Sequence, residues 1–175
     1  MPRYIIQKNP VDCAPTAVLN AALWAGKKIS FKNDYERLFR ESNCNWYGTK
    51  YKDIDDTLRR ELQGYCNVRK PINPSLFAIA KHIENGGAAI ISYYYKHRSK
   101  EHCHIALFSS ICNTKWIGHN VSRKSKETIS FKKIIKMFYN EHGNPRVWLL
   151  SKQTKKRQGI GFPNSRLECF SSLLP

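Results

Sequence analysis

The decisive stretch of this sequence reads Ile6-Gln7-Lys8-Asn9-Pro10-Val11-Asp12-Cys13-Ala14-Pro15-Thr16-Ala17. From Pro15 to Ala25 the chain is apolar nearly all round, which predicts a central, buried helix. Asp12 is placed to cap its first turn, and Gly26 is the expected stop. Cys13 therefore lies at the helix N-terminus, where backbone N–H groups and the helix dipole stabilise a thiolate and can lower the cysteine pKa when a cationic partner assists. Free cysteines are also among the most buried and inert residues, so position alone leaves an inert thiol as the alternative.

Length and composition favour one compact, folded domain. The chain has 175 residues, of which 41% are hydrophobic, 25% charged and 12% aromatic, and this aromatic share is too high for a disordered chain. Its longest apolar stretch, around Ala88 to Ile91, is far shorter than the roughly 18 residues that a membrane span needs. Residues 1–4 lead into no signal-peptide hydrophobic region. We therefore expect an intracellular protein with no membrane partner.

The net charge is strongly positive and unevenly placed. Lysine and arginine number 30 against 13 acidic residues, which gives +17, and the 55 residues after Asn120 carry 12 basic and 3 acidic residues. This excess predicts non-specific affinity for nucleic acid or an acidic partner. No zinc finger, helix-turn-helix or ribonucleoprotein motif predicts sequence-specific recognition. The basic run 152–157 has no clear period, so we divide the chain into a domain at 1–150 and a basic tail or arm at 151–175.

The six cysteines are scattered, without the paired C-x-x-C spacing of a zinc ribbon or a redox centre. In a reducing compartment they stay thiols, which leaves room for one of them to be a nucleophile. The run His102-Cys103-His104 is dense in metal-ligand types, but neighbours on a strand point to opposite faces, so no tetrahedral set follows. The sequence predicts neither a metal nor a cofactor.

The hydrophobic periods predict an α+β protein with helices first and an antiparallel sheet second. After the first helix, further helices are expected at about 34–41, 50–62, 75–85 and 131–139. Thr49 is the expected cap of the helix at 50–62. Strands are expected at 88–95, 104–108, 115–121 and 146–150, where β-branched and aromatic residues gather.

A nucleophilic thiol needs a base, and the base needs an orienting group. His104 opens a predicted strand, and the segment 115–120 can pair with that strand in antiparallel fashion. If residues 111–113 form a three-residue loop, His104 faces Asn120, whose amide oxygen can accept from an imidazole N–H. A two-residue loop would instead place Asn120 opposite Ile105. The spacing thus predicts an oriented base, and the strand register decides whether Asn120 faces His104.

The other nearby histidines are weaker candidates for the base. His102 shares a face of the strand with His104 and is the reserve base. His119 is expected to point to the other face of the sheet. Among these three, His104 is the one that the predicted pairing orients.

Gln7 lies six positions before Cys13, across a predicted polar turn. Its carboxamide can swing beside the sulfur, and with the Cys13 backbone N–H it would form a two-donor oxyanion hole. One such donor contributes about 10²–10³ in rate. A lone glutamine is a weak signal, since most glutamines are simply solvated, so this role depends on the other residues of the site.

These residues together resemble a known family. Residues 6–17, Gly48-Thr49, the run 86–91, the run 104–107 and Asn120 are similar to the papain-like cysteine peptidases of the bacteriocin-leader-processing type. The resemblance extends over about residues 4 to 150. It implies a papain-like fold in which the helix that carries the nucleophile packs against an antiparallel sheet.

The same resemblance implies the site. Cys13 would be the nucleophile, His104 the general base and acid, Asn120 the orienting residue and Gln7 the oxyanion residue. The sequence departs from the family pattern at three places: Ala14 and Cys103 stand where glycine is common, and Asn120 replaces the more frequent aspartate. None of these changes removes a reacting atom. The expected activity is hydrolysis of an amide or isopeptide bond in a protein or peptide substrate.

Two alternatives remain open at the level of sequence. A thioester-forming acyltransferase would use the same nucleophile, base and oxyanion donors. A basic structural or nucleic-acid-associated protein, such as a viral particle component, would keep the fold while its tail and charged surface carry the function. For the second alternative, function would survive loss of Cys13 and would depend on Lys155, Lys156 and Arg157.

Overall fold

The computed structural model of this chain describes residues 3–45, 48–97, 100–122, 124–139 and 145–153. The helices are α1 (Cys13–Ala25), α2 (Phe31–Glu41), α3 (Tyr51–Leu62), α4 (Leu76–Glu84) and α5 (Phe131–Phe138). The strands are β1 (Cys66–Arg69), β2 (Ala88–His97), β3 (Lys100–Cys112), β4 (Lys115–His119), β5 (Glu127–Ser130) and β6 (Val147–Lys152). The predicted α+β class is confirmed.

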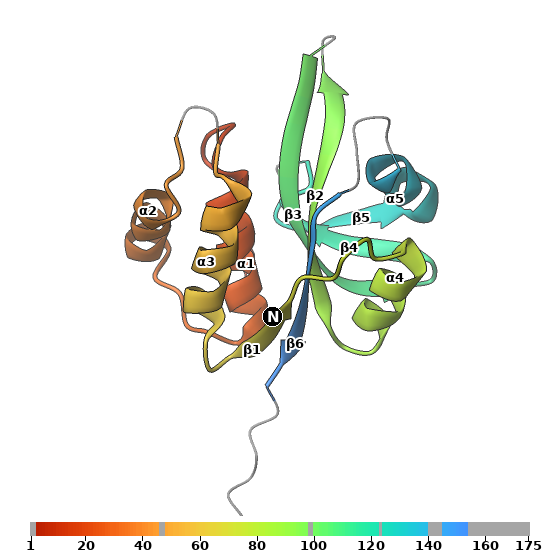
Figure 1. The fold of residues 1–175 in the computed structure, drawn as a ribbon, viewed down its shortest axis with the longest axis horizontal. Coiled ribbons are helices and arrows are strands. Elements are labelled where there is room, and N and C mark those ends of the chain that lie inside the picture. The colour runs from red at the N-terminus through yellow and green to blue at the C-terminus, as the bar shows by residue number, and fades with distance from the viewer. Residues whose placement is uncertain (1–2, 46–47, 98–99, 123, 140–144, 154–175) are drawn as a thin grey trace, which may run out of the picture.

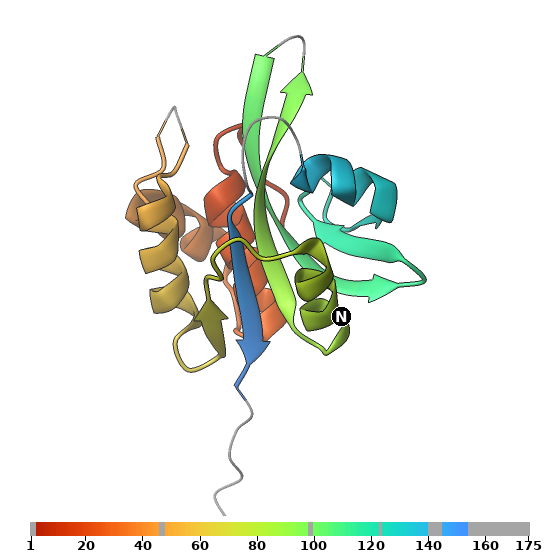
Figure 2. The same cartoon turned by 45° about the vertical axis from the view of Figure 1, so that its right-hand side comes forward.

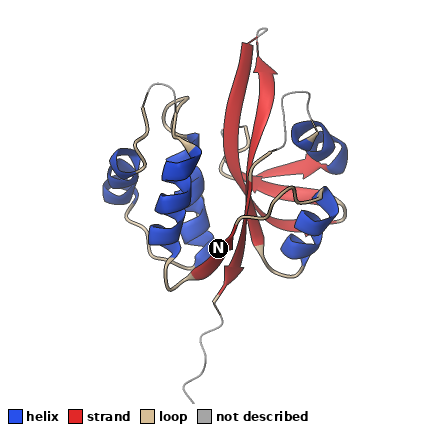
Figure 3. Ribbon diagram, viewed as in Figure 1, coloured by secondary structure: helices blue, strands red, loops and turns tan. Residues whose placement is uncertain are grey.

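A single antiparallel sheet separates two layers of helices. Its strand order is β1-β6-β2-β3-β4-β5, and every pairing in it is antiparallel. The helices α1, α2 and α3 lie on one side of the sheet and α4 and α5 on the other (Figure 1). A view turned by 45° keeps this separation and shows the long β2–β3 hairpin extending beyond the helices (Figure 2). Coloured by secondary structure, the strands stand as a partition between the two groups of helices (Figure 3).

Each face of the sheet forms its own hydrophobic core because side chains alternate along a strand. In β2, Ala88 and Ile90 belong to the core under α1, α2 and α3, whereas Ala89 and Ile91 belong to the core under α4 and α5. All four side chains are buried. The apolar run that the sequence places at 88–91 is therefore a strand covered on both faces.

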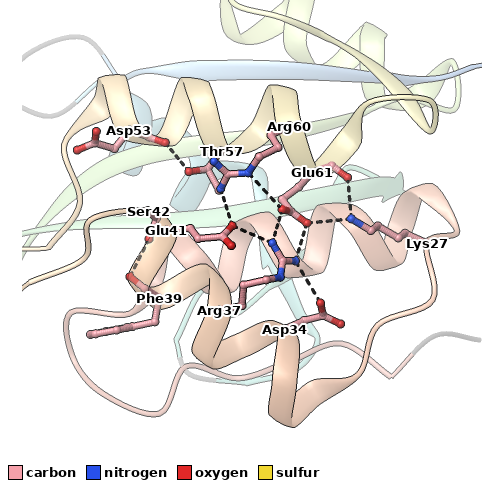
Figure 4. Close-up of polar contacts among 10 residues, drawn as sticks. All are labelled: Lys27, Asp34, Arg37, Phe39, Glu41, Ser42, Asp53, Thr57, Arg60 and Glu61. Atoms are coloured by element: carbon pink, nitrogen blue, oxygen red, sulfur yellow. Dashed lines mark hydrogen bonds and ion pairs between the residues drawn. The ribbon is translucent and has the colours of Figure 1, made fainter.

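A network of ion pairs joins the three helices on the α1 side (Figure 4). At its centre is Glu61 of α3, which is 3% exposed. Its Oε2 accepts from Lys27 Nζ at 2.8 Å, just after α1, and its Oε1 accepts from Arg37 Nη1 of α2 at 2.6 Å. Arg37 and Arg60 also both reach Glu41 at 2.9 Å. The N-terminal helices are thus tied to one another by charge as well as by apolar contact.

Several element boundaries differ from those expected. The first helix begins at Cys13 rather than Pro15, so the cysteine is its first residue. Asp12 is the N-cap residue, but its side chain makes no capping hydrogen bond. The third helix is capped at Lys50 rather than Thr49. β3 runs over 100–112 rather than 104–108, because residues 93–97 of β2 continue the ladder with it.

Two strands were not predicted. β1 and β5 have four residues each, too short for a clear alternating pattern. β1 pairs with β6, and β5 pairs with β4, so they form the two edges of the sheet. Their place in the fold comes from tertiary pairing rather than from local periodicity.

The predicted tail can be followed only at its start. β6 continues to Lys152, which pairs with Cys66, so the strand passes the expected boundary at 150 by two residues. Lys155, Lys156 and Arg157, on which the nucleic-acid alternative depends, lie outside the described residues. Within the described residues, no helix is long and apolar enough to cross a membrane.

Candidate active site

Cys13 lies where the N-terminus of α1 meets the sheet. It is 9% exposed, and the backbone N–H of Ile105 in β3 is directed at its thiol. β4 pairs with β3 only as far as the His119 and Leu107 pair, so the thiol meets β3 just beyond the end of β4. The predicted nucleophile is therefore next in space to the residue that follows His104.

The expectation of a lowered pKa for Cys13 is wrong for the thiol in this environment. Burial raises the pKa of Cys13 to about 12, against the opposing effect of the Ile105 N–H. Desolvation penalises the thiolate more than the helix N-terminus stabilises it. At neutral pH the isolated thiol is accordingly protonated, and its activation requires a base.

His104 is buried and its ring is oriented by a main-chain atom. Its Nε2 lies 2.6 Å from the backbone oxygen of Asn120, and Tyr93 packs edge-on against the ring at 5.5 Å between centroids. A carbonyl oxygen can only accept a hydrogen bond, so Nε2 carries the proton and donates it. In the neutral ring Nδ1 then holds the lone pair, the tautomer that a general base requires.

The Asn120 side chain is bound to Gln7. Asn120 Oδ1 accepts from the Gln7 backbone N–H at 3.1 Å, and Asn120 Nδ2 donates to Gln7 Oε1 at 2.8 Å. The backbone N–H can only donate, which fixes the amide orientation of Asn120 and, through it, that of Gln7. Gln7 Nε2 then donates to the Asn9 carbonyl oxygen at 2.8 Å. Asn120 thus joins His104, through its backbone, to Gln7, through its side chain.

No protein-family model matches the sequence, and no curated protein matches it. Among solved structures, the chain is similar to the peptidase domain of Streptococcus ComA, a bifunctional ABC transporter involved in a quorum-sensing pathway. The TM-score is 0.62 at 16% identity, over 85% of this chain and 98% of that one. It is also similar to a double-glycine-motif protease from an AMS/PCAT transporter in complex with a leader peptide, with a TM-score of 0.60 at 11% identity, over 88% and 93% of the two chains.

The fold is that of a papain-like peptidase domain. This confirms the fold expected from the sequence. At this low identity the likeness concerns the fold, and the roles of individual residues rest on the geometry of the site.

Within this papain-like fold the predicted strand register is wrong. The β3–β4 connection is a two-residue turn at Asn113 and Thr114, and a bulge between Phe108 and Ser110 then shifts the pairing. His104 is therefore not paired with Asn120 across the ladder, nor is Asn120 opposite Ile105. Asn120 instead follows the end of β4 with φ at 61°, a left-handed conformation that asparagine tolerates and that turns its carbonyl toward the imidazole.

The other two histidines considered as the base, His102 and His119, lie apart from this arrangement. The His102 side chain is exposed, whereas His104 is 6% exposed. His119 stacks on Tyr4 with ring centroids 3.5 Å apart, and its Nε2 meets Ser109 Oγ at 2.7 Å. Leu107, the strand partner of His119, belongs to the core on the α1 side, so His119 is on the opposite face from His104, as expected.

Two further groups near Cys13 were not found from the sequence. Tyr35 of α2 donates to Asp12 Oδ2, and the sequence assigned Asp12 only a capping role. On the other side, the Tyr51 hydroxyl lies 2.8 Å from Ser92 Oγ, and Ser92 Oγ lies 3.5 Å from the Cys103 sulfur. These contacts join residues 11 to 41 positions apart, so no local pattern signals them.

Proposed function

We propose that this protein is a papain-like cysteine peptidase that hydrolyses an amide bond of a protein or peptide substrate. Cys13 is the nucleophile, His104 the general base and acid, Gln7 an oxyanion donor and Asn120 the residue that orients both His104 and Gln7. The observations that carry this proposal are the hydrogen-bonded connection from His104 through Asn120 to Gln7 and the position of Cys13 as the first residue of α1.

The reaction follows from the atoms available. The Cys13 thiol transfers its proton to His104 Nδ1, and the sulfur attacks the substrate carbonyl carbon. The negative charge that forms on the carbonyl oxygen is held by the Gln7 amide and the Cys13 N–H, which has no partner inside the helix because Cys13 is its first residue. The His104 imidazolium then protonates the leaving amine.

The second half of the reaction releases the acyl group. His104, neutral again, removes a proton from water, and the resulting hydroxide attacks the thioester carbon. The tetrahedral intermediate collapses, the carboxylate product leaves, and the proton returns to the Cys13 sulfur. The Asn120 carbonyl keeps Nε2 protonated throughout, so Nδ1 is the nitrogen that exchanges protons.

Burial of Cys13 gives His104 a defined task. Because the pKa of the thiol is raised to about 12, little free thiolate exists near neutral pH. In the proposed mechanism, proton transfer from the thiol to the His104 imidazole forms an ion pair, in which each charge stabilises the other. We therefore expect reactivity to depend on His104 far more than it does for an exposed thiol.

The substrate class is peptides. One structural neighbour is a double-glycine-motif protease bound to a leader peptide. We expect this chain to act on an extended peptide segment that enters between the N-terminus of α1 and β3, where Cys13 and Ile105 meet.

The test is hydrolysis of a peptide library by the unchanged protein and by Cys13→Ala and His104→Ala. We expect cleavage by the unchanged protein and a loss of at least about 10³-fold in each variant, since nucleophile and base act as a unit. Cys112→Ala, which removes an exposed cysteine, is the matched control and should retain full activity. Equal cleavage by Cys13→Ala and the unchanged protein would refute the proposal.

A further inference from the structure

We infer that Tyr35, Asp12 and Asn9 form a positioning relay that fixes the Gln7 carboxamide for the oxyanion. The inference rests on the proposed peptidase function and extends it to residues that touch neither the thiol nor the imidazole. It assigns a role to a tyrosine on α2, the helix on the outer side of α1, and to the acid that precedes the nucleophile.

The relay begins with a buried hydroxyl and a buried carboxylate. Tyr35 is 4% exposed and Asp12 is fully buried, and the tyrosine hydroxyl donates to Asp12 Oδ2. The same hydroxyl accepts from the Lys8 backbone N–H at 3.0 Å. Burial and the adjacent carboxylate both raise the pKa of Tyr35, so it remains a donor over the whole working range of pH. The tyrosine hydroxyl therefore binds the turn between Gln7 and Cys13 at two places, the Lys8 backbone N–H and the Asp12 carboxylate.

The Asp12 carboxylate in turn binds Asn9. Asp12 Oδ2 also accepts from the Asn9 backbone N–H at 2.9 Å and from Asn9 Nδ2 at 3.0 Å. Three donors thus converge on one buried oxygen, and the described residues give Asp12 no ion pair that would explain its burial by charge. A buried carboxylate that is held only by neutral donors needs all of them. Asn9 is thereby fixed by its backbone and its side chain at once.

Gln7 is the residue that this arrangement holds. Its Nε2 donates one hydrogen to the Asn9 carbonyl, and its Oε1 accepts from Asn120 Nδ2. The amide is therefore fixed from the turn on one side and from the sheet on the other, and the proposed mechanism assigns its second N–H to the oxyanion. If the turn that carries the Asn9 carbonyl became loose, the Gln7 carboxamide could rotate, although every proposed reacting atom would still be present.

An oxyanion donor is less effective when its side chain can rotate. Its effect depends on being in place before charge develops, and a displacement of about 1 Å lowers the rate strongly. The sulfur and the imidazole have their own supports, in α1 and at the Asn120 carbonyl. The relay thus affects steps that form an oxyanion and leaves the nucleophilicity of Cys13 unchanged.

This difference defines the experiment, which compares two reactions of the same sulfur. A peptide aldehyde, with the sequence of the best substrate from the hydrolysis test, forms a hemithioacetal whose oxygen occupies the oxyanion site. Iodoacetamide alkylates the sulfur without forming an oxyanion. We expect Tyr35→Phe to weaken aldehyde inhibition about tenfold and Gln7→Ala about a hundredfold, the order expected for loss of one oxyanion donor. Neither variant should change the alkylation rate of Cys13 by more than about twofold.

Tyr139→Phe removes an exposed tyrosine hydroxyl on the α5 side of the sheet and serves as the matched control. It should leave both aldehyde inhibition and alkylation unchanged. Adding Tyr35→Phe to Gln7→Ala should weaken aldehyde inhibition no further, because the relay acts through Gln7. If Tyr35→Phe does not fold, Asn9→Ala on the exposed turn tests the same relay, with an expected loss of about threefold in aldehyde inhibition alone.

The outcomes separate the relay from the function on which it rests. Aldehyde inhibition of Tyr35→Phe or Asn9→Ala equal to that of the unchanged protein would overturn the relay alone. Equal loss of aldehyde inhibition and alkylation would also overturn it, since that result indicates general disturbance of the site. Failure of the unchanged protein to hydrolyse any peptide would overturn the peptidase proposal, and the relay with it.

Discussion

At the residue scale, Asn120 divides its two roles between main chain and side chain. Its carbonyl oxygen meets His104 and its amide meets Gln7. The sequence predicted a site role for this residue, but it predicted that the amide would orient the histidine. The actual arrangement depends on φ at 61°, which no residue pattern encodes.

Asn120→Gly separates these roles, because glycine keeps both the left-handed backbone and the carbonyl. We expect kcat to fall about tenfold, which is less than the roughly 10²–10³ that loss of a whole oxyanion donor costs. The acidic limb of the pH–rate profile should not move, because the carbonyl still orients His104. Steady-state kinetics from pH 4 to 9 make the measurement.

The control combines Asn120→Gly with Gln7→Ala. Since the Asn120 amide acts through Gln7, the double variant should be no slower than Gln7→Ala alone. A displaced acidic limb in Asn120→Gly would mean that the amide orients the histidine after all.

At the element scale, the β3–β4 hairpin explains why the register prediction failed. The expected loop at 111–113 omitted Thr114, because threonine is an unusual residue for a turn that needs positive φ at both of its central positions. Asn113 has φ at 48° and Thr114 at 63°. The bulge between Phe108 and Ser110 adds a second shift. Long apolar elements such as α1 and β2 were predictable from periodicity, whereas a strained turn and a bulge were not.

The strained turn offers a direct test of this account. A β-branched residue in the left-handed region costs about 1–2 kcal/mol, and glycine avoids this while losing some chain entropy. We expect Thr114→Gly to raise the free energy of unfolding by about 0.5–1 kcal/mol. Urea unfolding measures the change.

Thr128→Gly is the matched control for the turn. Thr128 is exposed in the neighbouring strand β5, where glycine weakens the structure, so the free energy of unfolding should fall. Destabilisation by Thr114→Gly of the same size as by Thr128→Gly would show that the turn is not strained.

At the scale of the whole molecule, the proposed site lies where two layers of the fold meet. Cys13 and Gln7 come from the α1 side, whereas His104 and Asn120 come from the sheet. The placement of the three N-terminal helices therefore affects the site. The Glu61 network that joins these helices links their placement to pH.

The pKa of Glu61 is lowered from 4.5 to about 2, chiefly by its hydrogen bond to Arg37 and against the effect of burial. Because the pKa is lower in the folded state, this stabilisation is complete above the unfolded pKa and is lost as pH falls from about 4.5 to about 2. It amounts to about 3 kcal/mol at neutral pH. We expect Glu61→Gln to lose most of it at pH 7 and to show little further change between pH 5 and 2.5.

Urea unfolding across this pH range makes the comparison, and Glu84→Gln, at an exposed end of α4, is the control that should follow the unchanged protein. Parallel pH curves for Glu61→Gln and the unchanged protein would contradict the assignment of this stability to Glu61.

The central claim, that Cys13 and His104 act as a pair, is tested most directly by alkylation with limiting iodoacetamide at pH 7. Mass spectrometry compares Cys13 with the exposed Cys112 in the same sample. We predict that Cys13 reacts faster than Cys112 in the unchanged protein and at least about tenfold more slowly in His104→Ala, with Cys112 unaffected. A Cys13 that reacts more slowly than Cys112, at a rate indifferent to His104→Ala, would contradict the account.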